Sequence, residues 1–233
     1  PLERGLQPEE VVEIVRDAFD KASEKTGIES RIILCTLRHF SEAQDLQTVK
    51  LVEQFRHRRV AALDLAADEA GFPIDSHVAA FRYAMEKNIP RTAHAGEAKG
   101  PESVWETLKK LNPSRIGHGV RSIEDPALIE HLKAQQIHLE VCPTCNVQID
   151  IFDTHADHPI DRLYKAGLSA GINTDGRTLP RVTLTEEYEK LHRTFGWQKT
   201  DFLNCNLNAL QAAFVGEDVK KALMERLREA YSS

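Results

Sequence analysis

Arg91-Thr92-Ala93-His94-Ala95-Gly96-Glu97 is a short apolar run that ends on a histidine, turns at a glycine and continues to a glutamate. The pattern predicts a β-strand whose end points His94 and Glu97 into one pocket. A lone histidine at a strand end is more often structural than functional, so a functional interpretation needs support from the other strands. Five more β-type runs occur along the chain, at 31–37, 60–65, 115–119, 138–142 and 168–175.

The six runs recur at a regular spacing. Intervals of 23 to 32 residues separate the successive markers Cys35, Asp64, His94, His118, Val141 and Asn173. Helical patterns lie between the runs, at 46–58, 77–87 and 101–111. Strands that alternate with helices at this interval are typical of βα units and a parallel sheet. Because no linker or low-complexity stretch interrupts the pattern, we expect residues 1–233 to form a single domain.

Two α/β architectures have this rhythm, an open doubly wound sheet and a closed (β/α)8 barrel. A dinucleotide-binding sheet needs a GxGxxG motif after an early strand, and the sequence has none. A barrel instead gathers polar residues at the carboxyl ends of many strands. Such residues end run after run here: Arg38, His39, Asp64, Asp68, Glu69, His94, Glu97, His118 and Asp175. We therefore predict a (β/α)8 TIM-type barrel.

The predicted barrel is incomplete in this sequence. A complete one has eight strands and about 250 residues, whereas six βα units are visible, followed by helical segments at 201–214 and 218–231. Because the sequence begins at Pro1, we expect the first two units to be the missing ones. Six open strands would expose two edges, so we expect the missing N-terminal segment of the same protein to be a partner.

Composition excludes several classes of partner. The 233 residues carry a net charge of -6 without a basic stripe, which argues against nucleic-acid binding. No apolar run is long enough to cross a membrane, so no membrane partner is expected. The pair Cys142 and Cys145 has no second CxxC or HxxxH to complete a structural zinc site, which favours reduced thiols in a cytoplasmic protein. The sequence does not exclude a targeting segment, since the chain does not begin with methionine.

Two further segments add chemistry to the strand ends. RIGHG at 115–119 places His118 between glycines, which predicts room for close approach by a ligand. GINTDG at 171–176 is an apolar strand that ends on Asp175. Imidazole and carboxylate are ligands of catalytic zinc, which keeps one position for water and lowers the pKa of that water towards ~7. A nearby carboxylic acid can donate a proton, and a second histidine can orient or deprotonate the water.

The chain resembles the adenosine deaminase family, and specifically its bacterial branch. Five motifs carry the resemblance in order: LDLAADEAGFP at 63–73, TAHAGE at 92–97, RIGHG at 115–119, VCPTCN at 141–146 and INTDGR at 172–177. The resemblance implies a barrel of the metal-dependent hydrolase kind with one Zn²⁺ in each complete active site. It also implies hydrolytic deamination of adenosine or deoxyadenosine to inosine and ammonia when the N-terminal segment is present.

The resemblance also implies roles for individual residues. His94 and Asp175 would be zinc ligands, and Glu97 would be the acid that protonates purine N1. His118 would work on the zinc-bound water, and Asp175 would help to orient the hydroxide that attacks C6. Substrate-binding positions are expected at Asp64, Ala67 and Gly176.

Three departures from the family pattern bear on this assignment. The HxH motif that supplies two more zinc ligands is absent, and we interpret His155 and His158 as surface residues rather than replacements. Ala67 stands where the family commonly has glycine, and Gly176 stands where many members have Asp or Asn. The last two changes keep open a different 6-aminopurine substrate, such as adenine or a modified nucleoside. A non-catalytic nucleoside-binding barrel is the alternative of another class.

Overall fold

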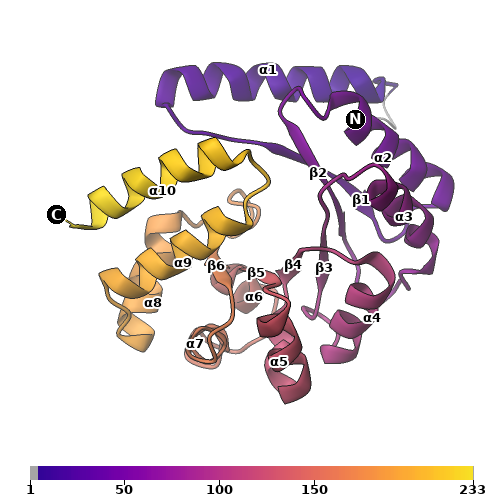
Figure 1. The fold of residues 1–233 in the computed structure, drawn as a ribbon. Helices are drawn as coiled ribbons and strands as arrows, with labels where there is room; N and C mark the ends of the chain where they lie inside the picture. Colours follow the sequence, from indigo (N-terminus) through magenta and orange to yellow (C-terminus); the bar gives the residue numbers. More distant parts are fainter. Residues whose placement is uncertain (1–4, 233) are drawn as a thin grey trace.

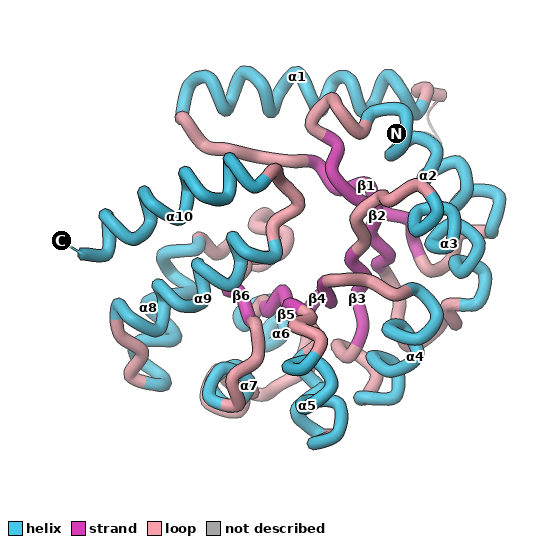
Figure 2. Tube along the Cα trace, viewed as in Figure 1, coloured by secondary structure: helices cyan, strands magenta, loops and turns pink. Residues whose placement is uncertain are grey.

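The computed structural model describes residues 5–232, and its centre is an array of six parallel strands in chain order (Figures 1 and 2). All six strands fall on the predicted runs. They are β1 (Ile32–Leu37), β2 (Val60–Ala66), β3 (Thr92–Ala95), β4 (Arg115–His118), β5 (His138–Val141) and β6 (Ala170–Ile172).

Pairing follows the chain order throughout. β1 pairs with β2, and β3, β4, β5 and β6 pair in succession, all in parallel. A parallel bridge between Leu63 and Arg91 joins the two groups, with the Leu63 N–H 3.0 Å from the carbonyl of Pro90. Within residues 5–232, the outer edges of β1 and β6 have no ladder partner. The structure therefore confirms six consecutive units of a parallel barrel and leaves the array open between β6 and β1.

Helices follow the strands and surround the array (Figure 1). The long ones are α1 (Pro8–Thr26), α2 (Glu42–Phe55), α3 (Val78–Glu86), α4 (Pro101–Leu111), α5 (Pro126–Ala134), α8 (Leu184–Phe195), α9 (Lys199–Ala212) and α10 (Glu217–Ser232), and the short ones are α6 (Pro143–Gln148) and α7 (Ile160–Lys165). α2 begins four residues before the predicted position, because Ser41 and Gln44 form a capping box that satisfies backbone N–H groups at its start. No helix within residues 5–232 is both long and apolar enough to traverse a bilayer.

The core consists of two apolar clusters on either side of β3. One joins β1 and β2 to the inner faces of α2 and α3, with Phe55 and Phe81 as its largest members. The other joins β4, β5 and β6 to α5, α7 and α8, and includes Leu128, Leu139 and Trp197. Ala93 of β3 belongs to the first cluster and its neighbour Ala95 to the second. The strand that ends in His94 is thus fixed by packing from both sides.

Candidate active site at the carboxyl ends of the strands

The four residues expected to carry the chemistry lie at the same end of the strand array. His94 is in β3, His118 is the last residue of β4, and Asp175 follows β6. The rings of His94 and His118 have centroids 5.1 Å apart. His118 Nδ1 lies 3.3 Å from Glu97 Oε1, and His118 Nε2 lies 3.7 Å from Asp175 Oδ2. Side chains from β3, β4 and the β6 loop therefore form one cluster at the carboxyl ends, where barrel chemistry is located.

Asp64 of β2 fixes the orientation of His94. Its carboxylate lies 3.3 Å from His94 Nδ1, so Nδ1 carries the hydrogen of that bond and Nε2 is left for another partner. Burial lowers the pKa of His94, but the hydrogen bond and charge of Asp64 outweigh it and raise that pKa to about 9. The backbone of His94 is held as well, because Arg38 donates to its carbonyl at 2.8 Å. Whether Asp64 also touches a substrate stays a prediction.

The glycines on either side of His118 leave space for neighbouring side chains. A Cβ on Gly117 would come within 2.8 Å of His94 Nδ1, and one on Gly119 would come within 2.7 Å of Leu139 Cδ2. The room expected for a ligand at Gly117 is therefore taken up by the imidazole of His94. Gly119 also has φ of 65°, a left-handed conformation that glycine adopts without a steric penalty.

Glu69 clamps the loop that carries Glu97. Glu69 is 4% exposed, and its carboxylate accepts five hydrogen bonds. The donors are the backbone N–H groups of residues 96 to 99, at 2.7 to 3.1 Å, and the hydroxyl of Ser103 at 2.6 Å. Burial raises the pKa of Glu69, but the Ser103 hydroxyl and the backbone donors more than compensate and lower it. Glu69 thereby sets the position of Glu97 without lying in the cluster itself.

Replacing Glu69 with Gln is expected to destabilise the protein by about 3 kcal/mol, because an amide NH₂ would face backbone donors that need an acceptor. Glu69 has a lowered pKa in the folded state. It therefore contributes stability above the usual carboxyl pKa, and this contribution is lost as the pH falls through its folded value. Denaturant unfolding at several pH values should show the gap between wild type and E69Q narrowing on acidification. Glu86→Gln, on the exposed face of α3, is the control, and an equal loss in both variants would contradict the clamp.

The pKa values of Glu97 and His118 are shifted in opposite directions, and only that of Glu97 suits proton transfer at neutral pH. Burial, together with the charges of Asp175 and Glu69, raises the pKa of Glu97 to about 7, against the opposing effect of His94. Burial and the charge of His94 lower the pKa of His118 to about 4. A carboxyl group able to hold a proton thus lies beside a neutral imidazole.

Asp175 is the most exposed member of the cluster. Its Oδ2 accepts a hydrogen bond from the Cys145 thiol at 3.1 Å, and its Oδ1 accepts the N–H of Gly176 at 2.7 Å. Burial raises the pKa of Asp175, but the hydrogen bonds from the Cys145 thiol and the Gly176 N–H, together with the charge of His94, outweigh it and lower that pKa. The carboxylate is therefore ionised and opens to solvent.

Within residues 5–232, one group of metal-capable side chains is compact: ligand atoms of His118, Cys142 and Asp175 all lie within 4.8 Å of one another. Burial raises the pKa of the Cys142 thiol well above its usual value, which makes it a poor ligand at neutral pH. The ionised Asp175 carboxylate is of a type that catalytic zinc accepts, and so is Nε2 of His94 once it has lost its proton. The donor types therefore suit a zinc ion, and His94 and Asp175 stay the two predicted ligands.

Three residues at the carboxyl ends have strained backbones. Ala67 after β2, His118 at the end of β4 and Asp175 after β6 have φ of 80°, 59° and 55°. A non-glycine residue in this left-handed region costs about 1–3 kcal/mol and persists where the surrounding structure enforces it. Ala67 and Gly176, the other expected substrate positions, are exposed at this face, and a Cβ on Gly176 would meet no atom within 4 Å.

The sequence did not point to two buried residues behind the cluster. Asn146 of α6 is fully buried and contacts both Glu97 and His118. His158, which we expected on the surface, is 2% exposed and contacts Asn146, so that prediction is wrong. His155 is half-buried and lies 3.1 Å from the Thr144 hydroxyl, so it is not a free surface residue either. VCPTCN carries Asn146, but only the fold shows what its side chain contacts.

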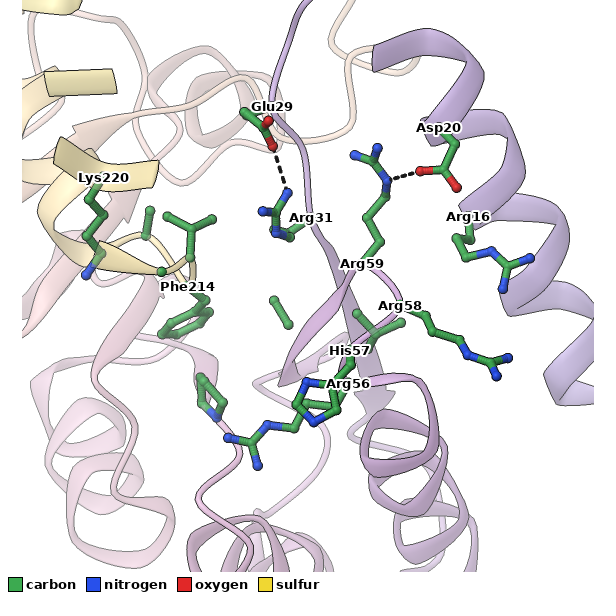
Figure 3. Close-up of a pocket in the computed structure, with 16 residues that line it drawn as sticks. Arg16, Asp20, Glu29, Arg31, Arg56, His57, Arg58, Arg59, Phe214 and Lys220 are labelled. Atoms are coloured by element: carbon green, nitrogen blue, oxygen red, sulfur yellow. Dashed lines mark hydrogen bonds and ion pairs between the residues drawn. The ribbon is translucent and has the colours of Figure 1, made fainter. Parts of the chain in front are cut away.

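A separate cavity of about 970 Å³ lies at the opposite end of the strands (Figure 3). It is basic, with Arg16, Arg31, Arg56, Arg58, Arg59 and Lys220 in its lining. Its arginines are largely engaged by the chain itself: Arg59 with Asp20 at 2.6 Å, and Arg31 with Glu29 at 2.9 Å. Because the strand ends that it faces are the amino ends, this cavity is not the candidate active site.

Six βα units with imidazole and carboxylate groups at the carboxyl ends of their strands define an incomplete (β/α)8 barrel of the metal-dependent hydrolase kind. The chain belongs to the adenosine deaminase family, whose family model matches residues 2–230. Adenosine deaminases of Salmonella schwarzengrund and Salmonella typhimurium are each 37% identical to it over 220 residues, or 94% of this chain. The chain spans 66% of the length of those relatives.

Solved structures show the same fold. An adenine deaminase from Arthrobacter aurescens has a TM-score of 0.93 and 27% identity, covering 100% of this chain and 71% of that one. An amidohydrolase from Burkholderia ambifaria, solved with bound Zn, has a TM-score of 0.90 and 25% identity, covering 98% of this chain and 64% of that one. An N6-methyl-AMP deaminase from Arabidopsis thaliana, at 24% identity and a TM-score of 0.86, shares the fold.

Proposed function

We propose that this chain forms most of the active site of a zinc-dependent hydrolase that converts adenosine or deoxyadenosine to inosine and ammonia. The observation that carries the proposal is the contact chain from Glu97 through His118 to Asp175, with His94 beside it at the open end of the array. Membership of the adenosine deaminase family supports the reaction type.

Each member of the cluster has a distinct task in this proposal. Glu97, with its pKa raised to about 7, holds a proton at neutral pH and donates it to N1 of the purine, which makes C6 more electrophilic. His118 lies 3.3 Å from Glu97 and is neutral, so it can orient an attacking water by hydrogen bonding. The ionised Asp175 carboxylate, 3.7 Å from His118 Nε2, faces the same space.

His94 through Nε2 and Asp175 through its carboxylate would hold the zinc ion. Bound zinc would supply a Lewis acid that makes water nucleophilic at neutral pH. The contact between Asp64 and His94 Nδ1 supports this assignment, because metal-bound histidines usually donate their other ring N–H to a carboxylate or carbonyl group. The proton that gives His94 a pKa of about 9 competes with the metal, so zinc binding would release a proton.

Asp64→Asn is expected to lower zinc affinity by about 10- to 100-fold, because the amide no longer favours the hydrogen on Nδ1 of His94 as strongly as a carboxylate does. Competition with a fluorescent zinc chelator measures the affinity directly. Asp153→Asn, in an exposed loop, is the matched control. An unchanged zinc affinity combined with a raised KM would instead place Asp64 at the substrate.

Two further βα units would complete the barrel between β6 and β1, and we propose that a segment of the same protein supplies them. The unpaired outer edges of β1 and β6 support this proposal, as does the length of the curated relatives. So does α1, which exposes 57% of Ile14 and 38% of Phe19. These units would also bring the remaining zinc ligands.

The function is tested by following the ultraviolet absorbance change that accompanies conversion of adenosine to inosine. The 233-residue chain alone should bind substoichiometric zinc and show no significant turnover, whereas the protein with the completing units should be active. Adenine and a modified nucleoside serve as competing substrates, since Ala67 and Gly176 depart from the family pattern and one structural relative is an adenine deaminase. Nucleoside binding without turnover by the completed, zinc-loaded protein would support a binding barrel instead.

A further inference from the structure

Asn146 connects Glu97 and His118, the two predicted catalytic residues. Its side chain is fully buried, with Nδ2 at 2.9 Å from Glu97 Oε1 and 3.1 Å from His118 Nδ1. Its Oδ1 lies 3.2 Å from Nε2 of His158, which is also buried. Four side chains from four parts of the chain are therefore joined by short polar contacts.

The orientation of the Asn146 amide follows from a backbone group. The N–H of Ile160 can only donate, and it lies 3.1 Å from His158 Nδ1, so this nitrogen accepts and carries no hydrogen. Burial lowers the pKa of His158 to about 3, which leaves the ring neutral with its one hydrogen on Nε2. Nε2 therefore donates to the oxygen of Asn146, and the amide nitrogen faces Glu97 and His118.

The amide nitrogen has two hydrogens and two acceptors. One hydrogen goes to Glu97 Oε1 and the other to His118 Nδ1. An imidazole that accepts a hydrogen bond at Nδ1 carries its hydrogen on Nε2, which in His118 is the atom on the side of Asp175. Both contacts of Glu97 use Oε1, which leaves Oε2 as the oxygen that carries a proton.

We propose that Asn146, oriented by His158, is a positioning residue that fixes His118 as the tautomer with its hydrogen on Nε2 and holds Glu97 beside it. The inference rests on the proposed function and deepens it. His118 then acts on the attacking water as a hydrogen-bond donor rather than as the base that removes its proton. Glu97 presents Oε2 to the purine. The oxygen of the Asn146 amide contributes by keeping the amide from rotating.

The tautomers can be read by two-bond ¹H–¹⁵N correlation spectra of histidine-labelled protein carrying the completing units. In the wild type, His118 and His158 should both show a protonated Nε2 and an unprotonated Nδ1. Asn146→Leu should leave His118 as a mixture of tautomers and lower kcat by about 10- to 100-fold, as for other partners of active-site groups. KM and zinc content should change little, because neither substrate nor metal touches residue 146.

A matched pair of variants at His158 separates positioning from mere packing. In His158→Gln, the side-chain amide keeps an N–H donor near the position of Nε2, and the variant should retain most of the wild-type kcat. In His158→Met, a side chain of similar length has no donor, and kcat should fall as far as in N146L. Equal kcat in H158Q and H158M, or a hydrogen on Nδ1 of His118 in the wild type, would overturn the inference. If the spectra show the predicted tautomers but the completed protein deaminates no aminopurine, the inference is supported and the proposed function is contradicted.

Discussion

Glu97→Gln is expected to lower kcat for adenosine by about 10²- to 10⁴-fold in the protein with a completed barrel, the range that positioned general acids contribute. An amide of the same shape still accepts the hydrogen bond from Asn146 but has no acidic proton to give to N1. Zinc should stay bound, because Glu97 is not among the proposed ligands. Steady-state kinetics and metal analysis of the same preparation provide the two measurements.

Glu130→Gln on the exposed face of α5 is the control for the charge change and should leave kcat unaltered. The informative result is a loss of kcat without a loss of bound zinc. If E97Q lost its zinc but kept its residual turnover per bound metal, the residue would be a ligand or a ligand support and the assigned role would be wrong.

His94→Ala should weaken zinc binding by more than the ~100-fold that loss of a supporting partner costs, because it removes a ligand outright. Turnover should fall to the detection limit, since the water would lack the activation that the metal supplies. His94 also packs against His118 and contacts Asp64, so the thermal unfolding midpoint of the variant needs to be measured alongside. His57→Ala, at an exposed histidine beyond α2, is the control.

Chelation and readdition of zinc complete the test of His94. The wild-type protein should lose activity with a chelator and regain it with one equivalent of Zn²⁺ per site. The H94A protein should recover only at a large excess of zinc, if at all. Full activity of H94A at stoichiometric zinc would remove His94 from the ligand set.

The fold was predictable because its signals are local. The strands are short, largely apolar runs with polar residues at or near the ends of most of them, and the 23- to 32-residue interval leaves room for one crossover helix. The start of α2 was missed by four residues, since the apolar periodicity begins at Leu46 while the Ser41 cap starts the helix earlier. α1 was not predicted at all: only Val12 of its residues is buried, so packing imposes a weak pattern on its sequence.

The site was predictable only in part, for a related reason. His94, Glu97, His118 and Asp175 stand out because strand ends mark them. Glu69 and Asn146 act through hydrogen bonds to residues 27 to 49 positions away, and no spacing rule encodes such contacts. His158 lies in a polar loop and was therefore expected on the surface. In the fold its ring packs against Phe152 and accepts the N–H of Ile160, the first residue of α7. Buried polar networks depend on tertiary neighbours, which a single sequence does not display.

The left-handed conformations of Ala67, His118 and Asp175 have a consequence for protein engineering. Glycine relieves such strain, so selection for heat resistance alone would favour glycine at the exposed positions 67 and 175. At the buried position 118 it would not, because loss of the imidazole would leave a cavity that costs more than the strain. At residue 67 the change would give the residue that the family resemblance implies and keep the backbone N–H. At residue 175 it would delete a carboxylate on which turnover is proposed to depend. Thermal selection on this barrel would therefore erode its chemistry unless activity were selected in the same round.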